Sequence, residues 1–297
     1  MSRSGTKPRV LDLLRSTRPG QWIKNALVVT VPVAAGSPEV LSPEVLSVVA
    51  AFVLVSGGMY TFNDILDKEI DQSNPHKKDR PVASGRISAK TAAILTSVCL
   101  LSGFVLALVA GTSVFAVLLT YALLVAAYSI ELKKLPWLEV AIIAAGFVLR
   151  VLAGGIVTDA PVTPGFLATI TAGAVLVVLG KRYSELVNSF GHQTTTRASL
   201  KGYSTRSLRL GMSASLLATI IAYGYTAATR YDPERIWSLL YLFSCVPVLP
   251  AGAIFVKQAI DGKAESPEKL LVSNRSLALL AALWAGLFAF ASYKVLG

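Results

Sequence analysis

Residues 44–62 form a largely apolar stretch, EVLSVVAAFVLVSGGMYTF, and residues 63–71 follow it with an acidic one, NDILDKEID. A run of about 20 apolar residues is the length that an α-helix needs to cross roughly 30 Å of hydrocarbon. The acids begin where this helix would leave the membrane. The sequence therefore predicts a membrane-spanning helix that carries a group of carboxylates at one end.

The rest of the chain repeats the apolar pattern. Of its 297 residues 54% are hydrophobic and only 15% are charged, and the mean hydropathy is +0.60, unlike a soluble domain. These values predict an all-α polytopic membrane protein, with a basic cytosolic segment at residues 1–21 and one nine-helix domain at residues 22–297. The nine expected spans are Trp22–Gly36, Glu44–Phe62, Ala89–Ala110, Ser113–Ser129, Trp137–Val157, Pro164–Gly180, Leu208–Thr229, Ile236–Val256 and Ser276–Val295.

The basic residues are distributed unevenly between the two ends of these spans. Of 28 Lys and Arg residues, 24 fall on one side, 3 fall on the other, and Arg150 lies within a span. Positive residues concentrate on the cytosolic side, so we expect a cytosolic N-terminus and an outer C-terminus in the bacterial cell membrane. This distribution also explains the net charge of +11 without a nucleic-acid partner. The longest polar loops, residues 63–88 and 181–207, then lie in the cytosol, where we expect the active site.

The acids after residue 62 share one face of a helix. At about 100° per residue, Asp64, Asp67 and Asp71 project within a sector of about 60° if the helix continues through them, whereas Glu69 points elsewhere. Like charges repel, and these also meet the negative end of the helix dipole. Oxygen ligands at this spacing suit Mg²⁺ shared with a substrate's phosphate oxygens. The alternative is a charged helix end in solvent.

Basic side chains surround these acids on the same membrane face. A divalent ion with many cations indicates a polyanionic substrate, although positive-inside topology alone would account for each lysine taken singly. Arg150 differs because a charge in the middle of a span is costly, and we favour a cavity-lining role over a purely structural one. The other cations of interest are Lys24, Lys77, Lys78, Arg80, Lys133, Lys134, Lys181 and Arg182.

Three patterns resemble those of a known family. They are N-D-x-x-D-x-x-x-D at residues 63–71, K-x-x-R-P-x-x-x-G at residues 77–85 and Y-S-x-x-x-K-K at residues 128–134. The chain resembles the UbiA superfamily of intramembrane prenyltransferases over essentially its whole length. The resemblance implies nine helices around a lipid-accessible cavity, with Mg²⁺ and a diphosphate held at its cytosolic mouth by two acidic motifs. Carried over by position, the metal ligands of the first motif would be Asp64, Asp67 and Asp71.

The second motif departs from the family's D-x-x-x-D. The chain reads G-K-R-Y-S-E-L-V-N at residues 180–188, so Lys181 and Glu185 stand where two aspartates are expected, with Asn188 on the same face. One carboxylate fewer leaves open whether one or two Mg²⁺ ions bind, while the added ammonium suits an extra phosphate group on the donor. With R-P-x-Q-W-x-K-N at residues 18–25, this motif is similar to the superfamily branch of polyprenyl-phosphate phosphoribosyltransferases.

That similarity implies Mg²⁺-dependent transfer of 5-phosphoribose from 5-phosphoribosyl 1-diphosphate to polyprenyl (decaprenyl) phosphate, with diphosphate leaving, toward cell-wall arabinan. The lipid phosphate is already an anion and needs no general base. The expected catalytic residues are Asp64, Asp67, Asp71, Lys181 and Glu185. The expected substrate-binding residues are Lys24, Asn25, Asn63, Lys77, Lys78, Arg80, Tyr128, Lys133, Lys134, Arg150, Arg182, Tyr183 and Asn188.

Three other functions are compatible with parts of the sequence. Transfer of a prenyl chain to an aromatic acceptor would use the same first motif, but Lys181 argues against it. A transporter would carry charges near the bilayer midplane in both halves, and only Arg150 is of that kind. A lipid-binding scaffold would not need three acids at metal-binding spacing. The sequence leaves the isoprenoid length and the oligomeric state open, including a homo-oligomer.

Overall fold

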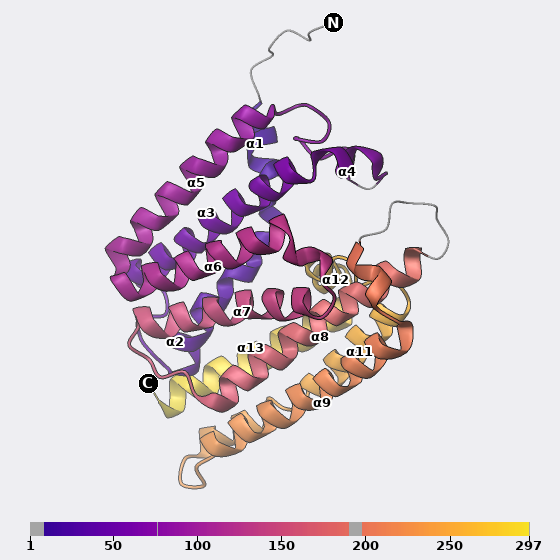
Figure 1. Ribbon diagram of the computed structural model, residues 1–297. Coiled ribbons are helices and arrows are strands. Elements are labelled where there is room, and N and C mark those ends of the chain that lie inside the picture. The colour runs from indigo at the N-terminus through magenta and orange to yellow at the C-terminus, as the bar shows by residue number, and fades with distance from the viewer. Residues whose placement is uncertain (1–8, 76, 190–197, 297) are drawn as a thin grey trace, which may run out of the picture.

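The computed structural model describes residues 9–75, 77–189 and 198–296, and every regular element in these ranges is a helix (Figure 1). The long helices run side by side as an all-α bundle, as the sequence predicts. Eight helical segments among the described residues are long and apolar enough to cross a membrane. They are α3 (Pro43–Leu66), α5 (Ala89–Ala110), α6 (Thr112–Ile130), α7 (Leu138–Val157), α8 (Pro164–Ser189), α9 (Thr205–Arg230), the segment Ile236–Ile260 that contains α10 (Leu239–Phe243) and α11 (Val248–Ile260), and α13 (Arg275–Val295).

The first expected span is not a regular α-helix. Its residues lie in a 3₁₀ helix, η1 (Pro19–Val29), followed by the short helix α2 (Thr30–Ala34). A 3₁₀ helix rises about 2.0 Å per residue against about 1.5 Å for an α-helix, so these two elements together extend about 30 Å. That length matches the hydrocarbon core. A total of nine spans remains a prediction.

Polar side chains determine where several helices begin. The Ser42 hydroxyl accepts a hydrogen bond from the Val45 amide at the start of α3, where Pro43 also stands in the first turn. Ser88 caps α5, Asn274 caps α13, and Ser204 forms a capping box with Ser207 at the start of α9. Such caps satisfy amide groups that have no partner within the helix. They lie where the sequence changes from polar loop to apolar span.

Small residues allow the inner helices to approach one another closely. A Cβ atom on Gly154 of α7 would lie 1.9 Å from the carbonyl oxygen of Val28 in η1. On Gly103 of α5 it would lie 2.6 Å from a methyl group of Val55 in α3. Close backbone contact at small residues is typical of helix packing in membranes. The irregular segment η1 is therefore fixed directly against α7.

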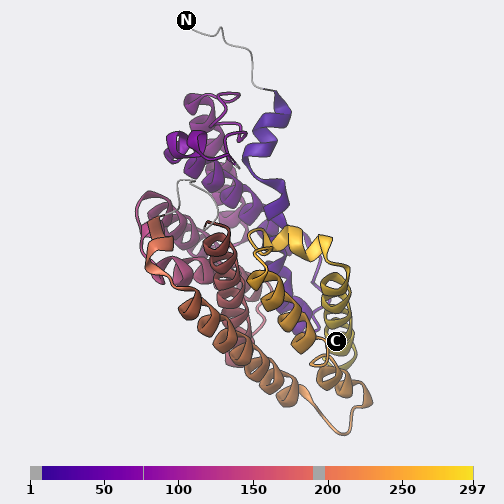
Figure 2. The same ribbon diagram turned by 90° about the vertical axis from the view of Figure 1, so that its right-hand side faces the viewer.

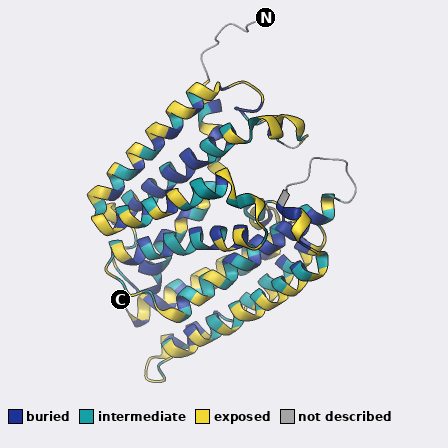
Figure 3. Cartoon of the chain, in the orientation of Figure 1, coloured by how far each residue is buried: buried dark blue, intermediate teal, exposed yellow. Residues whose placement is uncertain are grey.

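The outer faces of the bundle are apolar. On α5 the exposed side chains include Ile94, Val98, Leu101 and Val105, which recur every three or four residues. Exposed residues predominate on the outer helices in Figure 3, whereas α3 carries many buried positions. Such faces would be unfavourable in water and fit lipid chains. The protein is a multi-pass membrane protein.

Three short helices lie at the end of the bundle away from the C-terminus, with α12 apart from α1 and α4 (Figures 1 and 2). They are α1 (Val10–Ser16), α4 (Lys68–Ser73) and α12 (Pro267–Ser273). Helix α1 packs on α3, and its Asp12 carboxylate lies 3.0 Å from Arg86 Nε. The segment before the first span, which contains α1, therefore lies at the same end of the bundle as the first acidic motif. A domain boundary at residue 21 remains a prediction.

Candidate active site

A cleft of about 690 Å³ lies at this end of the bundle, between α1, the start of η1, the end of α3, the loop at Arg80 and α12. This volume is within the usual range for a site that holds a small molecule. Five of its lining side chains are cationic and two are acidic, so the cleft favours a polyanionic ligand. The lining residues are Arg15, Arg18, Gly20, Gln21, Asp64, Arg80, Pro81, Lys181, Ser266, Glu268, Lys269, Val272 and Ser273.

Two acids of the first motif converge on one guanidinium group. The carboxylates of Asp64 and Asp71 are buried, and Arg80 Nη1 lies 3.1 Å from the first and 2.6 Å from the second. Arg18 binds the same Asp64 oxygen. Burial raises the pKa of the Asp71 carboxyl, and Arg80 opposes this shift. Both carboxylates therefore point toward one position, which the Arg80 guanidinium occupies.

The single carboxylate face expected for the motif is found only for Asp64 and Asp71, because α3 ends at Leu66 and the Asp67 carboxylate contacts Lys133. Asp67 joins α3 to α4, and the Asp71 amide donates to the Asp67 carbonyl at 2.8 Å, so the turn continues. The Asp67 carboxylate accepts a hydrogen bond from Asn63 Nδ2 at 2.9 Å and also binds Lys133. Glu69 is exposed, in agreement with its exclusion from the set.

The remaining basic residues near the first motif differ in their distance from the acids. Lys77 Nζ lies 3.9 Å from Asp71. Lys78 is exposed, and Lys134 pairs at 2.8 Å with exposed Glu131 instead of reaching the motif. Of the loop lysines considered, Lys77 and Lys133 thus contact the acids.

In the described part of the chain, no three acidic, His or Cys side chains lie close enough together to form a metal site. The donor chemistry nonetheless fits a hard cation. Asp64 and Asp71 already share one cationic contact, and Asp67 lies one helical turn from each. Mg²⁺ binds through one or two carboxylates and fills its other positions with water and phosphate oxygens. A metal at this point would have to displace the Arg80 guanidinium.

The second motif divides between the cleft and the protein interior. Lys181 lines the cleft, with its ammonium 3.9 Å from Glu185. Arg182 is 1% exposed and lies 2.9 Å from Glu139 of α7, and it also binds Glu185. The Tyr203 hydroxyl donates to Glu139 at 3.1 Å, and burial raises the pKa of Tyr203 to about 12. Arg182 is thus part of a buried network between α7 and α8, and it does not line the cleft as the substrate-binding assignment requires.

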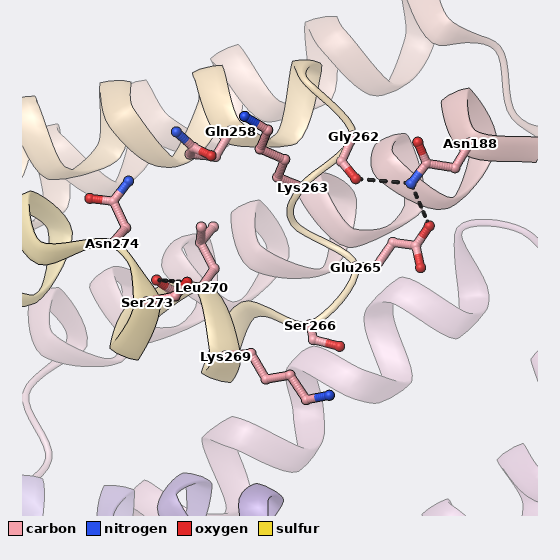
Figure 4. A pocket seen from close by; sticks show the side chains of 10 residues that line it. All are labelled: Asn188, Gln258, Gly262, Lys263, Glu265, Ser266, Lys269, Leu270, Ser273 and Asn274. Carbon is pink, nitrogen blue, oxygen red and sulfur yellow. Dashed lines mark hydrogen bonds between the residues drawn. The ribbon is translucent and has the colours of Figure 1, made fainter. Parts of the chain in front are cut away.

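Two further residues of this motif point away from the cleft. Tyr183 is 3% exposed, packs in a hydrophobic cluster and accepts a hydrogen bond from Arg209 at 3.0 Å. Asn188 donates to the Gly262 carbonyl at 2.9 Å and to Glu265 at 2.6 Å, at the edge of a second cavity of about 460 Å³ (Figure 4). Their contacts indicate packing and loop-holding roles in place of the expected binding roles.

Arg150 is buried, its guanidinium makes several hydrogen bonds, and it lines neither of the two cavities described above. It donates to Asn25 at 2.8 Å, to the Tyr121 hydroxyl at 2.9 Å and to the Gly146 carbonyl at 2.5 Å. These contacts support a structural role for Arg150 in place of the expected cavity-lining role. The same holds for Asn25, which was expected to bind substrate. Lys24 lies nearer the cleft, with its ammonium 3.9 Å from Glu268 of α12.

Several cleft residues were absent from the expected set. Gln21 binds Glu268, so it links η1 to α12. Arg18 and Gln21 belong to the pattern at residues 18–25, so the sequence could have indicated that they line the site. Arg15 and Lys269 carried no such signal beyond their positive charge, because nothing in the sequence shows that α1 and α12 line the same cleft. Tyr128 is half-buried on α6.

The UbiA prenyltransferase family matches residues 26–274. The chain belongs to this family. A decaprenyl-phosphate phosphoribosyltransferase of Mycobacterium tuberculosis is 31% identical over 93% of this chain and 92% of its own length. Another, of Mycolicibacterium smegmatis, is 29% identical over 97% of this chain and 94% of its own. A UbiA homologue of Archaeoglobus fulgidus, solved with GPP and Mg²⁺, has a TM-score of 0.74 at 18% identity and covers 96% of this chain and 100% of its own, which shows the UbiA fold.

The buried network predicts that Arg182 stabilises the fold. Arg182→Met leaves Glu139 buried without its cation, which commonly costs about 3–5 kcal/mol. We expect a clearly lower midpoint of thermal unfolding in detergent. Lys181→Met, next along the chain and partly exposed, should leave the midpoint nearly unchanged. Arg182→Met combined with Glu139→Gln should recover much of the loss, and a fully stable Arg182→Met with weakened donor binding would contradict this role.

Proposed function

We propose that this protein transfers 5-phosphoribose from 5-phosphoribosyl 1-diphosphate to the phosphate of a polyprenyl lipid of the decaprenyl type. The observation that carries the proposal is the cation-rich cleft, in which Lys181 takes the place of a family aspartate. A prenyl diphosphate offers one anionic group, whereas the ribosyl donor offers two. Relatives that align over nearly the whole chain carry the name decaprenyl-phosphate phosphoribosyltransferase, which supports the same assignment.

The reaction is a single displacement at the anomeric carbon. An oxygen of the lipid phosphate forms a bond to C1 of the ribose, and the bond from C1 to the diphosphate oxygen breaks. Diphosphate leaves with the electron pair, and no proton has to be removed from the acceptor. This agrees with a cleft in which five described cationic side chains stand against two acidic ones. The chain's main contribution is to bind and orient anions.

We propose Asp64, Asp67 and Asp71 as the ligands of Mg²⁺, which would neutralise charge that develops on the leaving diphosphate. Arg80 now holds two of these carboxylates. When the donor binds, Arg80 can turn its guanidinium to the phosphates, where two parallel hydrogen bonds are favourable. Lys133, bound to Asp67, and Lys24, beside Glu268, are the candidates for the lipid phosphate.

Substitution of each motif acid should stop turnover without unfolding the protein. Asp64→Asn, Asp67→Asn and Asp71→Asn are expected to lower kcat by at least about a hundredfold, since groups that stabilise transition-state charge commonly contribute that much. Exposed Glu69→Gln is the matched control and should be mild. The measurement is initial rate at saturating Mg²⁺, with size-exclusion profiles as a check of folding. Equal sensitivity of Glu69 and Asp67 would show that the helical-face argument is wrong.

The donor and the product configuration test the function itself. A diphosphate that covers the α face leaves the opposite face of the ribose open, so we expect a β-linked polyprenyl-phosphoryl 5-phosphoribose and no covalent intermediate. Lys181→Asp, which restores the family's acidic pair, should impair use of the ribosyl donor. Label from ribosyl donor and from prenyl diphosphate would be followed into lipid, with the anomeric configuration read by NMR. Prenyl transfer to an aromatic acceptor, with no ribosyl transfer, would show that the proposed function is wrong. An α-linked product would leave the substrates unchanged but refute the single displacement.

We also propose that the N-terminus and the cleft face the cytosol and that the C-terminus lies outside. The support is the concentration of 24 of 28 basic residues on one side. Single cysteines at exposed Ser73 and Lys201, in a background without Cys99 and Cys245, should be protected from membrane-impermeant thiol reagents in intact cells. A cysteine at exposed Glu234 should react. The reverse labelling pattern would invert the orientation.

A further inference from the structure

Two cations of the cleft stand apart from the ion pairs around the acids. Arg15 of α1 and Lys269 of α12 both line the cleft and are both exposed. Among the described residues, neither side chain makes a hydrogen bond or ion pair. Arg18 and Arg80, in contrast, bind Asp64. The charges of Arg15 and Lys269 are therefore free to bind a ligand.

The Lys269 side chain is directed to the cleft. Lys269 lines both cavities, because α12 forms the wall between them. Figure 4 shows its ammonium pointing away from Gln258 and Asn274, which line the smaller cavity only. The positive charge thus lies toward the cleft that Arg15 and Asp64 also line.

The position of α12 is fixed from both sides. Its Glu268 binds Gln21 of η1 and lies 3.9 Å from Lys24 Nζ. The turn that precedes α12 is held by Asn188 through the Gly262 carbonyl and Glu265. Lys269 therefore projects from a helix whose location is already set, which reduces the entropy lost when it binds an anion.

We propose that Arg15 and Lys269 form the subsite for the 5-phosphate of the donor, while Asp64 and Asp71 serve the diphosphate. This assignment rests on the proposed function and names the part of the cleft that would distinguish the substrates. A sugar phosphomonoester needs cations at the end of the molecule remote from its leaving group. A prenyl diphosphate has only hydrocarbon there, for which two exposed cations are poor partners. Arg and Lys together suit a phosphate oxyanion, one through a planar fork and one as a point charge.

Ribose 5-phosphate tests the subsite without turnover, because it carries the monophosphate and lacks the diphosphate. Titration calorimetry on the full-length protein in detergent should show binding to the native protein. The double variant Arg15→Gln with Lys269→Gln should bind it at least about tenfold more weakly, since two charged hydrogen-bond donors are lost. Inorganic diphosphate with Mg²⁺ should bind both proteins equally. In transfer assays the double variant should raise KM for the ribosyl donor and leave kcat nearly unchanged.

Two variants serve as controls. Lys263→Gln removes an exposed lysine that lines only the smaller cavity and should change none of these values. Lys269→Arg keeps the charge and should retain most of the affinity. Failure of the native protein to bind ribose 5-phosphate, or equal binding by native protein and double variant, would overturn the subsite. Prenyl transfer without ribosyl transfer would instead overturn the proposed function, so the two failures are distinguishable.

Discussion

The Arg80 guanidinium joins two buried carboxylates, and the active end of the bundle is organised around that contact. Asp64 belongs to a membrane-spanning helix and Asp71 to the short helix after it, while Arg80 lies in the loop that follows. A buried carboxylate without a cation costs several kcal/mol, so this loop is held against α3 and α4 by electrostatics as well as by packing. The Asp64 carboxylate also binds Arg18, which holds the start of η1 at the cleft.

An acidic motif at the C-terminal end of a helix is unfavourable by itself, since the helix dipole and like-charge repulsion both oppose it. The chain compensates with arginine and lysine contributed by three other segments. These arginine and lysine side chains supply the positive charge that the carboxylates require. Under the proposed function, a metal ion would replace part of that charge when phosphate groups bind.

Much of this arrangement follows from the sequence, for identifiable reasons. The convergence of Asp64 and Asp71 and the exposure of Glu69 follow from helical periodicity, which local sequence determines. The assignments of Arg182 and Asn188 did not match their surroundings, because Glu139 lies on α7 and Gly262 in the turn before α12, and only tertiary structure brings these partners near. Arg15 and Lys269 were missed for the same reason: 254 positions apart in the chain, they become neighbours of one cleft only after folding.

The 3₁₀ geometry of η1 also decides how its polar residues align. With three residues per turn, side chains three apart are eclipsed, whereas in an α-helix they diverge by about 60°. Gln21 and Lys24 therefore stand in line, and one carboxylate, that of Glu268, can meet both at once. Along η1 the two residues lie about 6 Å apart. Under the proposed function, a lipid phosphate moving along η1 would meet two hydrogen-bond donors in line, Gln21 and Lys24.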